Sequence, residues 1–176
     1  MKSQELRLAR TSKPKQTETT RRWRFEITAA PTELPLHTKV EFSRRGSDDP
    51  YVLEPVRPEI IRPYGLPSPT VNHYTASAAV RQKIGALAGR KEPQARDVWD
   101  LEHLFRTIGA DPRPIPPYLR EQVAGAVERV FEMSFGIFQS HVVPYLNAEH
   151  QDLYGTREAW DRMRESVVGR LEELRS

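Results

Sequence analysis

The stretch QKIGALAGRKEPQARDVWDLEHLF, residues 82–105, contains the strongest structural pattern in this 176-residue chain. Apolar residues recur at helical spacing in its first half and again in its second half. Pro93 separates the halves, because proline disrupts a helix interior, and Ala95 restarts the pattern. The stretch therefore predicts two consecutive helices joined by a short turn. Their apolar stripes are Ala76, Val80, Ile84 and Leu87, followed by Val98, Leu101, Phe105 and Ile108.

Charged side chains gather where these two predicted helices meet. A helix advances about 100° per residue, so Lys83 lies at the edge of the first stripe and Arg90 near the same edge two turns later. The simplest interpretation of Lys83 is snorkelling, in which its stem covers apolar surface. Asp97 stands near the start of the second helix, where the dipole favours a carboxylate, so helix capping is its simplest role. Asp100 follows on the same face.

The same charges also permit a binding site. Lys83, Arg90 and Arg96 could hold an anion such as phosphate, with Asp97 and Asp100 orienting the cations. The histidines show no pair at metal-ligand spacing, and neither GxGxxG nor GxxxxGK[ST] occurs.

Upstream, RRWRFEIT and LHTKVEFS alternate apolar and polar residues, which predicts two antiparallel strands. Residues 46–70 form a proline-rich connector that should exclude a helix and leave at most edge strands such as EIIR. Its GSDD segment is predicted to be a turn. Downstream, one helix is expected from Tyr118 to about Ser140, and a last one begins after Thr156 as N-cap. The fold class is α+β, a partial sheet followed by about four helices.

We expect three parts: a basic N-terminal arm (1–21), an α/β part with the connector (22–70) and a helical domain (71–176). Residues 1–24 carry eight basic and two acidic side chains within a net charge of +3. Such a leader can attract phosphate backbones, although a solvated arm is the simpler interpretation. The chain has no cysteine and neither a membrane-length apolar run nor a signal-peptide pattern, so a cytoplasmic protein is expected.

The Lys83–Leu101 block QKIGALAGRKEPQARDVWDL resembles a motif of the AbiEii/AbiGii-type nucleotidyltransferase toxins. These belong to the polymerase-β-like nucleotidyltransferase superfamily and act in type IV toxin–antitoxin and phage-defence (abortive infection) pairs. Lys83, Arg90, the Arg96–Asp97 pair and Asp100 match that motif, while Trp99 replaces its usual tyrosine. TKVEFSRR resembles the strand that carries the superfamily's third acidic residue, which places Glu41 in that role. YGTREAWDRMRESVVGRLEEL resembles the family's C-terminal helix.

The resemblance implies Mg²⁺-dependent transfer of a nucleotidyl group from an NTP to an RNA, usually tRNA, and a cognate antitoxin as partner. No DNA or membrane partner is implied. Lys83 would contact triphosphate oxygens, Arg90 and Arg96 would neutralise phosphate, and Asp97 would be a catalytic or orienting carboxylate. Glu41 would complete the metal-facing acids, and Asp100 would support the site. Residues 22–70 would then be a remnant of the family's α/β domain, with a partial nucleotidyltransferase sheet.

The family's N-terminal signature, a Gly-Ser turn followed by Asp-x-Asp on a strand, does not occur in these residues. The GSDD segment has the wrong spacing and lies after the Glu41 strand. The first hypothesis is therefore a truncated toxin that is inactive alone, or one completed by a second polypeptide. The alternatives are a non-catalytic relative that binds a protein or RNA, and a basic RNA-binding module whose Lys–Arg–Asp block is structural.

Overall fold

The computed structural model describes residues 6–29, 32–43 and 49–175. Contacts within the chain divide it into two compact units, residues 1–48 and residues 49–176. The sequence predicted boundaries near residues 21 and 70. The structure instead groups the proline-rich segment after Asp49 with the helices.

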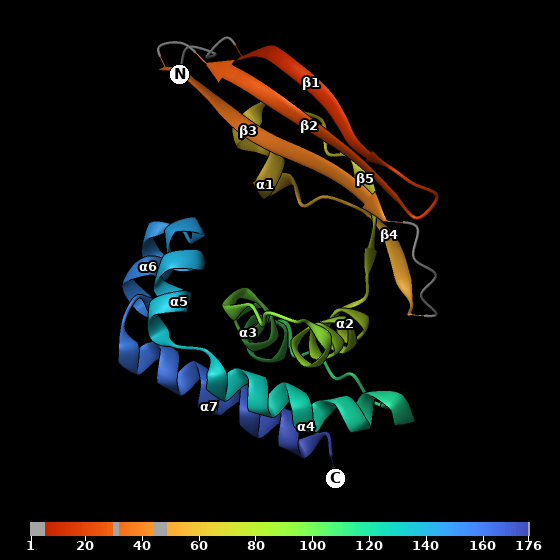
Figure 1. Cartoon of the computed structure of the whole chain (residues 1–176), viewed down its shortest axis with the longest axis vertical. Coiled ribbons are helices and arrows are strands. Elements are labelled where there is room, and N and C mark those ends of the chain that lie inside the picture. The colour runs from red at the N-terminus through yellow and green to blue at the C-terminus, as the bar shows by residue number, and fades with distance from the viewer. Residues whose placement is uncertain (1–5, 30–31, 44–48, 176) are drawn as a thin grey trace. The chain divides into compact units, whose positions relative to one another are not determined.

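The first unit is a three-stranded antiparallel sheet in the order β1-β2-β3 (Figure 1). Its strands are β1 (Leu6–Gln16), β2 (Thr20–Ala29) and β3 (Thr32–Ser43). The predicted antiparallel pair is confirmed as β2 and β3. β1 differs from the predicted solvated arm. Its charged sequence gives no apolar alternation, but its backbone groups find their partners along the edge of β2.

The two faces of this sheet differ in chemistry, because directly opposite residues on paired strands share a face. On one face Trp23 of β2 lies opposite Val40 of β3. Phe42 meets the Trp23 ring edge-on at a centroid distance of 5.7 Å. The other face is charged. In the described part of this unit only Thr20 is buried, so the sheet has no closed core of its own.

The second unit begins with a two-stranded antiparallel hairpin, β4 (Tyr51–Pro55) and β5 (Thr70–Tyr74). Helix α1 (Pro58–Ile61) and a 3₁₀ turn (Arg62–Tyr64) connect its strands. The prediction of an edge strand at EIIR is wrong. Pro58 occupies the first helical turn, where its missing N–H removes no hydrogen bond, so the helix tolerates it. Residues 46–48 of the predicted GSDD turn lie outside the described residues.

Helices make up the rest of this unit, and three predicted ones are confirmed. Ala76–Gly89 is a helix, a second one restarts at Ala95, and Thr156 caps the last one by accepting the Ala159 N–H at 3.2 Å. The long helix predicted after Tyr118 is divided, because Ser134 caps a new helix by accepting the Ile137 N–H. The helical elements are α2 (Ala76–Gly89), α3 (Ala95–Glu102), a π-helix (His103–Thr107), α4 (Pro117–Glu132), α5 (Phe135–His141), a 3₁₀ turn (Val143–Tyr145), α6 (Ala148–Tyr154) and α7 (Arg157–Glu173).

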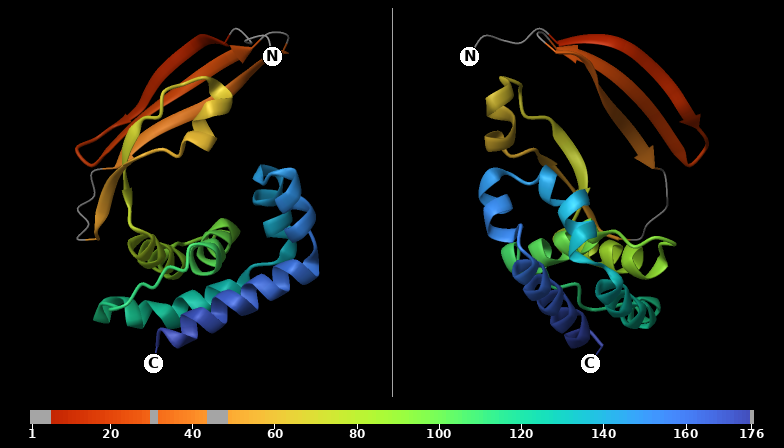
Figure 2. Two further views of the ribbon diagram at one scale, coloured as in Figure 1. Left: turned by 180° about the vertical axis from the view of Figure 1, so that it is seen from behind. Right: turned by 60° about the vertical axis from the view of Figure 1, so that its left-hand side comes forward.

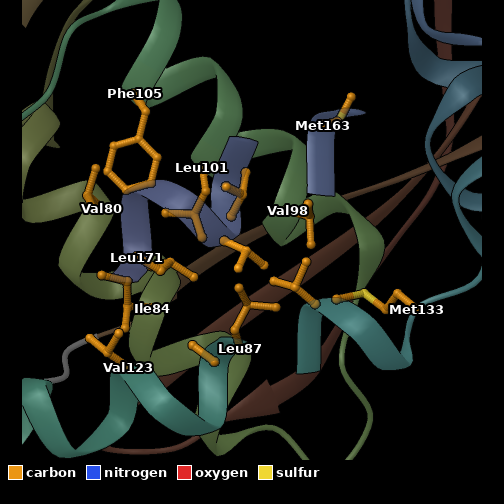
Figure 3. Packing of buried hydrophobic residues seen from close by; sticks show 14 of the residues in the cluster. Val80, Ile84, Leu87, Val98, Leu101, Phe105, Val123, Met133, Met163 and Leu171 are labelled. Atoms are coloured by element: carbon orange, nitrogen blue, oxygen red, sulfur yellow. The ribbon is translucent and has the colours of Figure 1, made fainter. Parts of the chain in front are cut away.

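One hydrophobic core joins α2, α3, α4, α5 and α7. Figure 3 shows Ile84 and Leu87 of α2 in the same cluster as Leu101 of α3, Val123 of α4 and Leu171 of α7. Figure 2 shows α4 and α7 running beside each other along this unit. Full burial of each leucine or valine contributes about 1.5–3 kcal/mol, so this core fixes α2 firmly against α3. No helix in the described part of the chain is long and apolar enough to cross a membrane.

Candidate phosphate-binding site

The core brings Lys83 of α2 against the first turns of α3. Its ammonium Nζ lies 3.0 Å from Asp97 Oδ1 and also contacts Asp100 Oδ2. The Lys83 side chain is 28% exposed, so its charge is shared between these carboxylates and solvent. A snorkelling lysine would reach water alone. Lys83 instead bridges two acids on neighbouring points of one helical face.

Asp97 is the centre of the cluster. Its side chain is fully buried, Oδ1 accepts from Lys83 Nζ, and Oδ2 accepts from Arg90 Nη1. Gln94 occupies the N-cap position of α3, and Asp97 lies inside the first turn, where the helix dipole favours its negative charge. Burying a carboxylate is costly unless it is paired, and Asp97 is paired twice. The buried Asp97 carboxylate therefore holds the Lys83 ammonium and the Arg90 guanidinium in fixed orientations.

Arg90 reaches Asp97 because α2 ends there. The residue is the C-cap of α2, with extended backbone angles, and its N–H still donates to the Ala86 carbonyl. This geometry turns its side chain back toward the start of α3. Only Nη1 binds Asp97, and the guanidinium has five N–H donors. The side chain is 34% exposed, so several donors of Arg90 remain available to a ligand.

Arg96 does not join the cluster. It is exposed and forms no ion pair or hydrogen bond with the described residues. It lines a groove of about 960 Å³ between the turn after α2, the start of α3 and the α5 region. Trp99, His141 and Tyr145 share this groove. Sequence patterns gave no sign of it, because its walls come from segments up to 55 residues apart, from Lys91 to Leu146.

Glu41 lies in the other compact unit, on β3. Arg22 of β2 donates to it through Nε at 2.6 Å. This hydrogen bond, aided by the charges of Arg22, Lys39 and Lys15, lowers the pKa of Glu41 below its ordinary value of 4.5. Glu41 is therefore an ionised, partly exposed carboxylate with an arginine already bound.

The described residues do not fit a Mg²⁺ site. No group of three or more acidic or histidine side chains among them could hold a metal. Both oxygens of Asp97 are committed to cations, and Glu41 binds Arg22. Mg²⁺ requires near-octahedral oxygen ligation, usually including one or two carboxylates free to bind it.

Two of three comparisons with known proteins give a match. A family model described as the nucleotidyl transferase AbiEii toxin of type IV TA systems matches residues 2–174. The fold is similar to a crystal structure of a candidate nucleotidyltransferase from H. pylori. That match has a TM-score of 0.55 and 15% identity, and covers 96% of this chain and 69% of that one. JHP933 from Helicobacter pylori matches with a TM-score of 0.53 and 15% identity, over 96% of this chain and 67% of that one.

No curated protein matches the chain. The two solved structures support the fold alone at their low identity, whereas the family model covers nearly every residue. The model's span includes both the sheet with Glu41 and the Lys83–Asp100 cluster. The chain belongs to the AbiEii nucleotidyltransferase toxin family.

Proposed function

We propose that this chain contributes to the transfer of a nucleotidyl group from an NTP to RNA, with tRNA as the acceptor. Lys83 and Arg90 contact triphosphate oxygens, and Asp97 holds both cations in place. The observation that carries this proposal is the single buried carboxylate shared by two partly exposed cations. A site preorganised in this way offers fixed charge to phosphate without reorganisation during the reaction.

Within the cluster, Arg90 is the main phosphate ligand. Lys83 is close to two carboxylates, which balance its charge, whereas Arg90 contacts one acid and keeps uncommitted donors. Planar guanidinium groups suit bidentate binding of phosphate oxygens. Asp100 supports the site by fixing the ammonium of Lys83. Arg96, which has no described partner, offers a further phosphate contact from the groove.

The family's reaction uses a divalent metal, which supplies Lewis-acid stabilisation of the triphosphate when bound. The described residues do not form that site, so we propose that its acids come from a Gly-Ser…Asp-x-Asp segment outside these 176 residues. Such a segment belongs to a longer chain or to a second polypeptide. The antitoxin of the pair is the expected protein partner, and the cytoplasm is the expected compartment.

A second candidate function rests on the charge balance of the cluster. Two cations and two carboxylates sum to zero, so the cluster can also serve only to join α2 to α3. A non-catalytic relative that binds a protein or RNA would keep it for that purpose.

Transfer of a labelled nucleotide to total tRNA distinguishes these candidates. The chain is assayed with Mg²⁺, alone and together with a polypeptide carrying the Gly-Ser…Asp-x-Asp segment. We expect label on tRNA only in the combined sample, and at least a hundredfold loss for Lys83→Ala or Arg90→Ala. Arg120→Ala, an exposed α4 arginine outside the cluster, is the control. Transfer that survives both cluster substitutions would contradict the proposed roles.

A further inference from the structure

The charged face of the β1-β2-β3 sheet, called here the basic face, gathers charged side chains outside the Lys83–Asp100 cluster. Opposite residues on neighbouring strands point to the same face. The strand register therefore arranges charged and polar side chains in rows that cross all three strands. The rows are Lys15–Arg22–Glu41, Ser12–Arg24–Lys39 and Arg10–Glu26–His37.

The two acids of the basic face are already occupied. Glu41 binds Arg22 at 2.6 Å, and Glu26 lies 4.0 Å from both Arg10 and His37. The remaining cations form no ion pair with any described residue. They are Lys15, Arg24 and Lys39.

The middle row is unfavourable for the folded sheet taken alone. Arg24 lies directly opposite Lys39, and the row's other member is the uncharged Ser12. Like charges in directly opposite positions destabilise a sheet. In the outer row Lys15 also lies opposite an arginine, Arg22, but there Glu41 offsets the repulsion by binding Arg22 at 2.6 Å. A bound anion between these side chains removes the repulsion and turns the arrangement into a favourable one.

The surface over this row is hollowed, with a volume of about 570 Å³. Its lining includes Arg24 and Lys39 of the middle row and Arg10 of the next one. Neighbouring strands lie about 4.8 Å apart, and successive same-face residues of one strand about 6.6 Å apart. The cations of the basic face therefore spread over more than one phosphate group, which suits a polyanion better than a small anion.

We infer that the basic face binds the phosphate backbone of the RNA acceptor, an inference that rests on the proposed transfer to RNA. Lys15, Arg24 and Lys39 contact phosphates, and the binding releases counterions from the RNA. The contacts carry no base specificity, because phosphates report shape and position alone. Glu41 lies on this same face, in the row of Lys15 and Arg22.

Fluorescence anisotropy with a labelled RNA hairpin, shaped as a tRNA acceptor stem, tests this inference without NTP. The full chain is titrated at several KCl concentrations, together with the double variants Arg24→Ala/Lys39→Ala and Arg120→Ala/Arg162→Ala. Both variants remove two positive charges, but the second pair lies exposed on α4 and α7. Loss of two phosphate contacts should reduce the slope of log K against log salt by about 1.8. We expect at least tenfold weaker binding for the first variant at low salt, and less than twofold change for the control.

Thermal unfolding separates binding from support of the sheet. Removing like charges relieves repulsion, so Arg24→Ala/Lys39→Ala and the milder Arg24→Gln/Lys39→Gln should keep or raise the Tm relative to wild type. Weak binding accompanied by a lower Tm in both variants would overturn the inference. Unchanged affinity and salt slope would overturn it as well.

The binding measurement uses no NTP, so its outcome can be separated from that of the transfer assay. A chain that binds RNA through Arg24 and Lys39 but transfers no nucleotide would retain the inference and contradict the proposed function. If Arg24→Ala/Lys39→Ala changes neither RNA affinity nor nucleotide transfer, the inference is contradicted and the proposed function is retained.

Discussion

The helical unit and the three-stranded sheet of this chain are stabilised in different ways. All buried hydrophobic side chains of the described residues belong to the helical unit, between Ala78 and Leu171. Among the described side chains of the sheet only Thr20 is buried, and Leu36 and Phe42 are more than half exposed. Packing thus determines the helical unit, whereas backbone pairing and cross-strand contacts determine the sheet.

Charged groups follow the same division. Asp97 in the helical unit is fully buried with two cations, while Glu41 in the sheet is 34% exposed with one. A buried pair is fixed in place and little screened by salt, whereas an exposed pair contributes little and weakens at higher ionic strength. The charged side chains of the helical cluster are therefore held in fixed positions, whereas those of the sheet can move and are more sensitive to salt.

The largest expected contrast comes from two leucines. Leu101→Ala removes a fully buried side chain from the α2–α3 contact and should lower the free energy of unfolding by about 2–5 kcal/mol. Leu36→Ala removes a side chain that is 60% exposed and should cost less than about 1 kcal/mol. Urea unfolding followed by circular dichroism measures both. Equal losses would show that the sheet has a core as rigid as that of the helices.

A smaller contrast is expected between the two aspartates of the cluster. Asp97→Ala leaves Lys83 and Arg90 without their shared buried partner and should cost about 3 kcal/mol. Asp100 is 38% exposed, so Asp100→Ala should cost about 0–1 kcal/mol. The same unfolding measurement serves for both variants. Similar losses of unfolding free energy in the two variants would contradict the central role of Asp97 in the cluster.

The smallest expected effect is the pH dependence of the sheet. Because Arg22 lowers the pKa of Glu41, the folded sheet favours the ionised carboxylate. This contribution is fully present above the ordinary value of 4.5 and is lost as pH falls through the lower pKa of the folded state. Amide hydrogen exchange of β2 and β3 between pH 3 and 6 should show a small loss of protection on acidification. Glu41→Gln should abolish that dependence; a Glu41→Gln sheet that is equally acid-sensitive would contradict the pairing.

The sequence predicts the helical unit better than the sheet. Helix α2 (Ala76–Gly89) covers the predicted apolar stripe from Ala76 to Leu87, because apolar spacing and the turn at Pro93 agree there. Ser134 was expected inside a helix, since a single serine in an apolar run gives no local sign that it caps a new one. Strand β1 was expected to be an arm, because the pairing that stabilises it comes from β2 and not from its own side chains.

Sequence patterns likewise predict only part of the candidate site. Helical spacing placed Lys83, Arg90, Asp97 and Asp100 near one another, and the structure joins these four in a single cluster. The spacing could not show that Asp97 is fully buried, because burial depends on how α2 packs against α3. Arg96 departs from the group since its side chain lies on the groove side of α3, a direction that only the fold determines.

Triphosphate binding tests the central claim, that Asp97 holds Lys83 and Arg90 as a phosphate-binding pair. Isothermal titration calorimetry with each NTP compares the wild-type chain with Arg90→Ala, and with Arg120→Ala as a control of equal charge change. Charge-assisted hydrogen bonds contribute about 1.5–3 kcal/mol, so their loss predicts roughly 10- to 150-fold weaker NTP binding in Arg90→Ala and no change in Arg120→Ala. Equal affinities in all three proteins would contradict the claim and leave the cluster as a joint between α2 and α3.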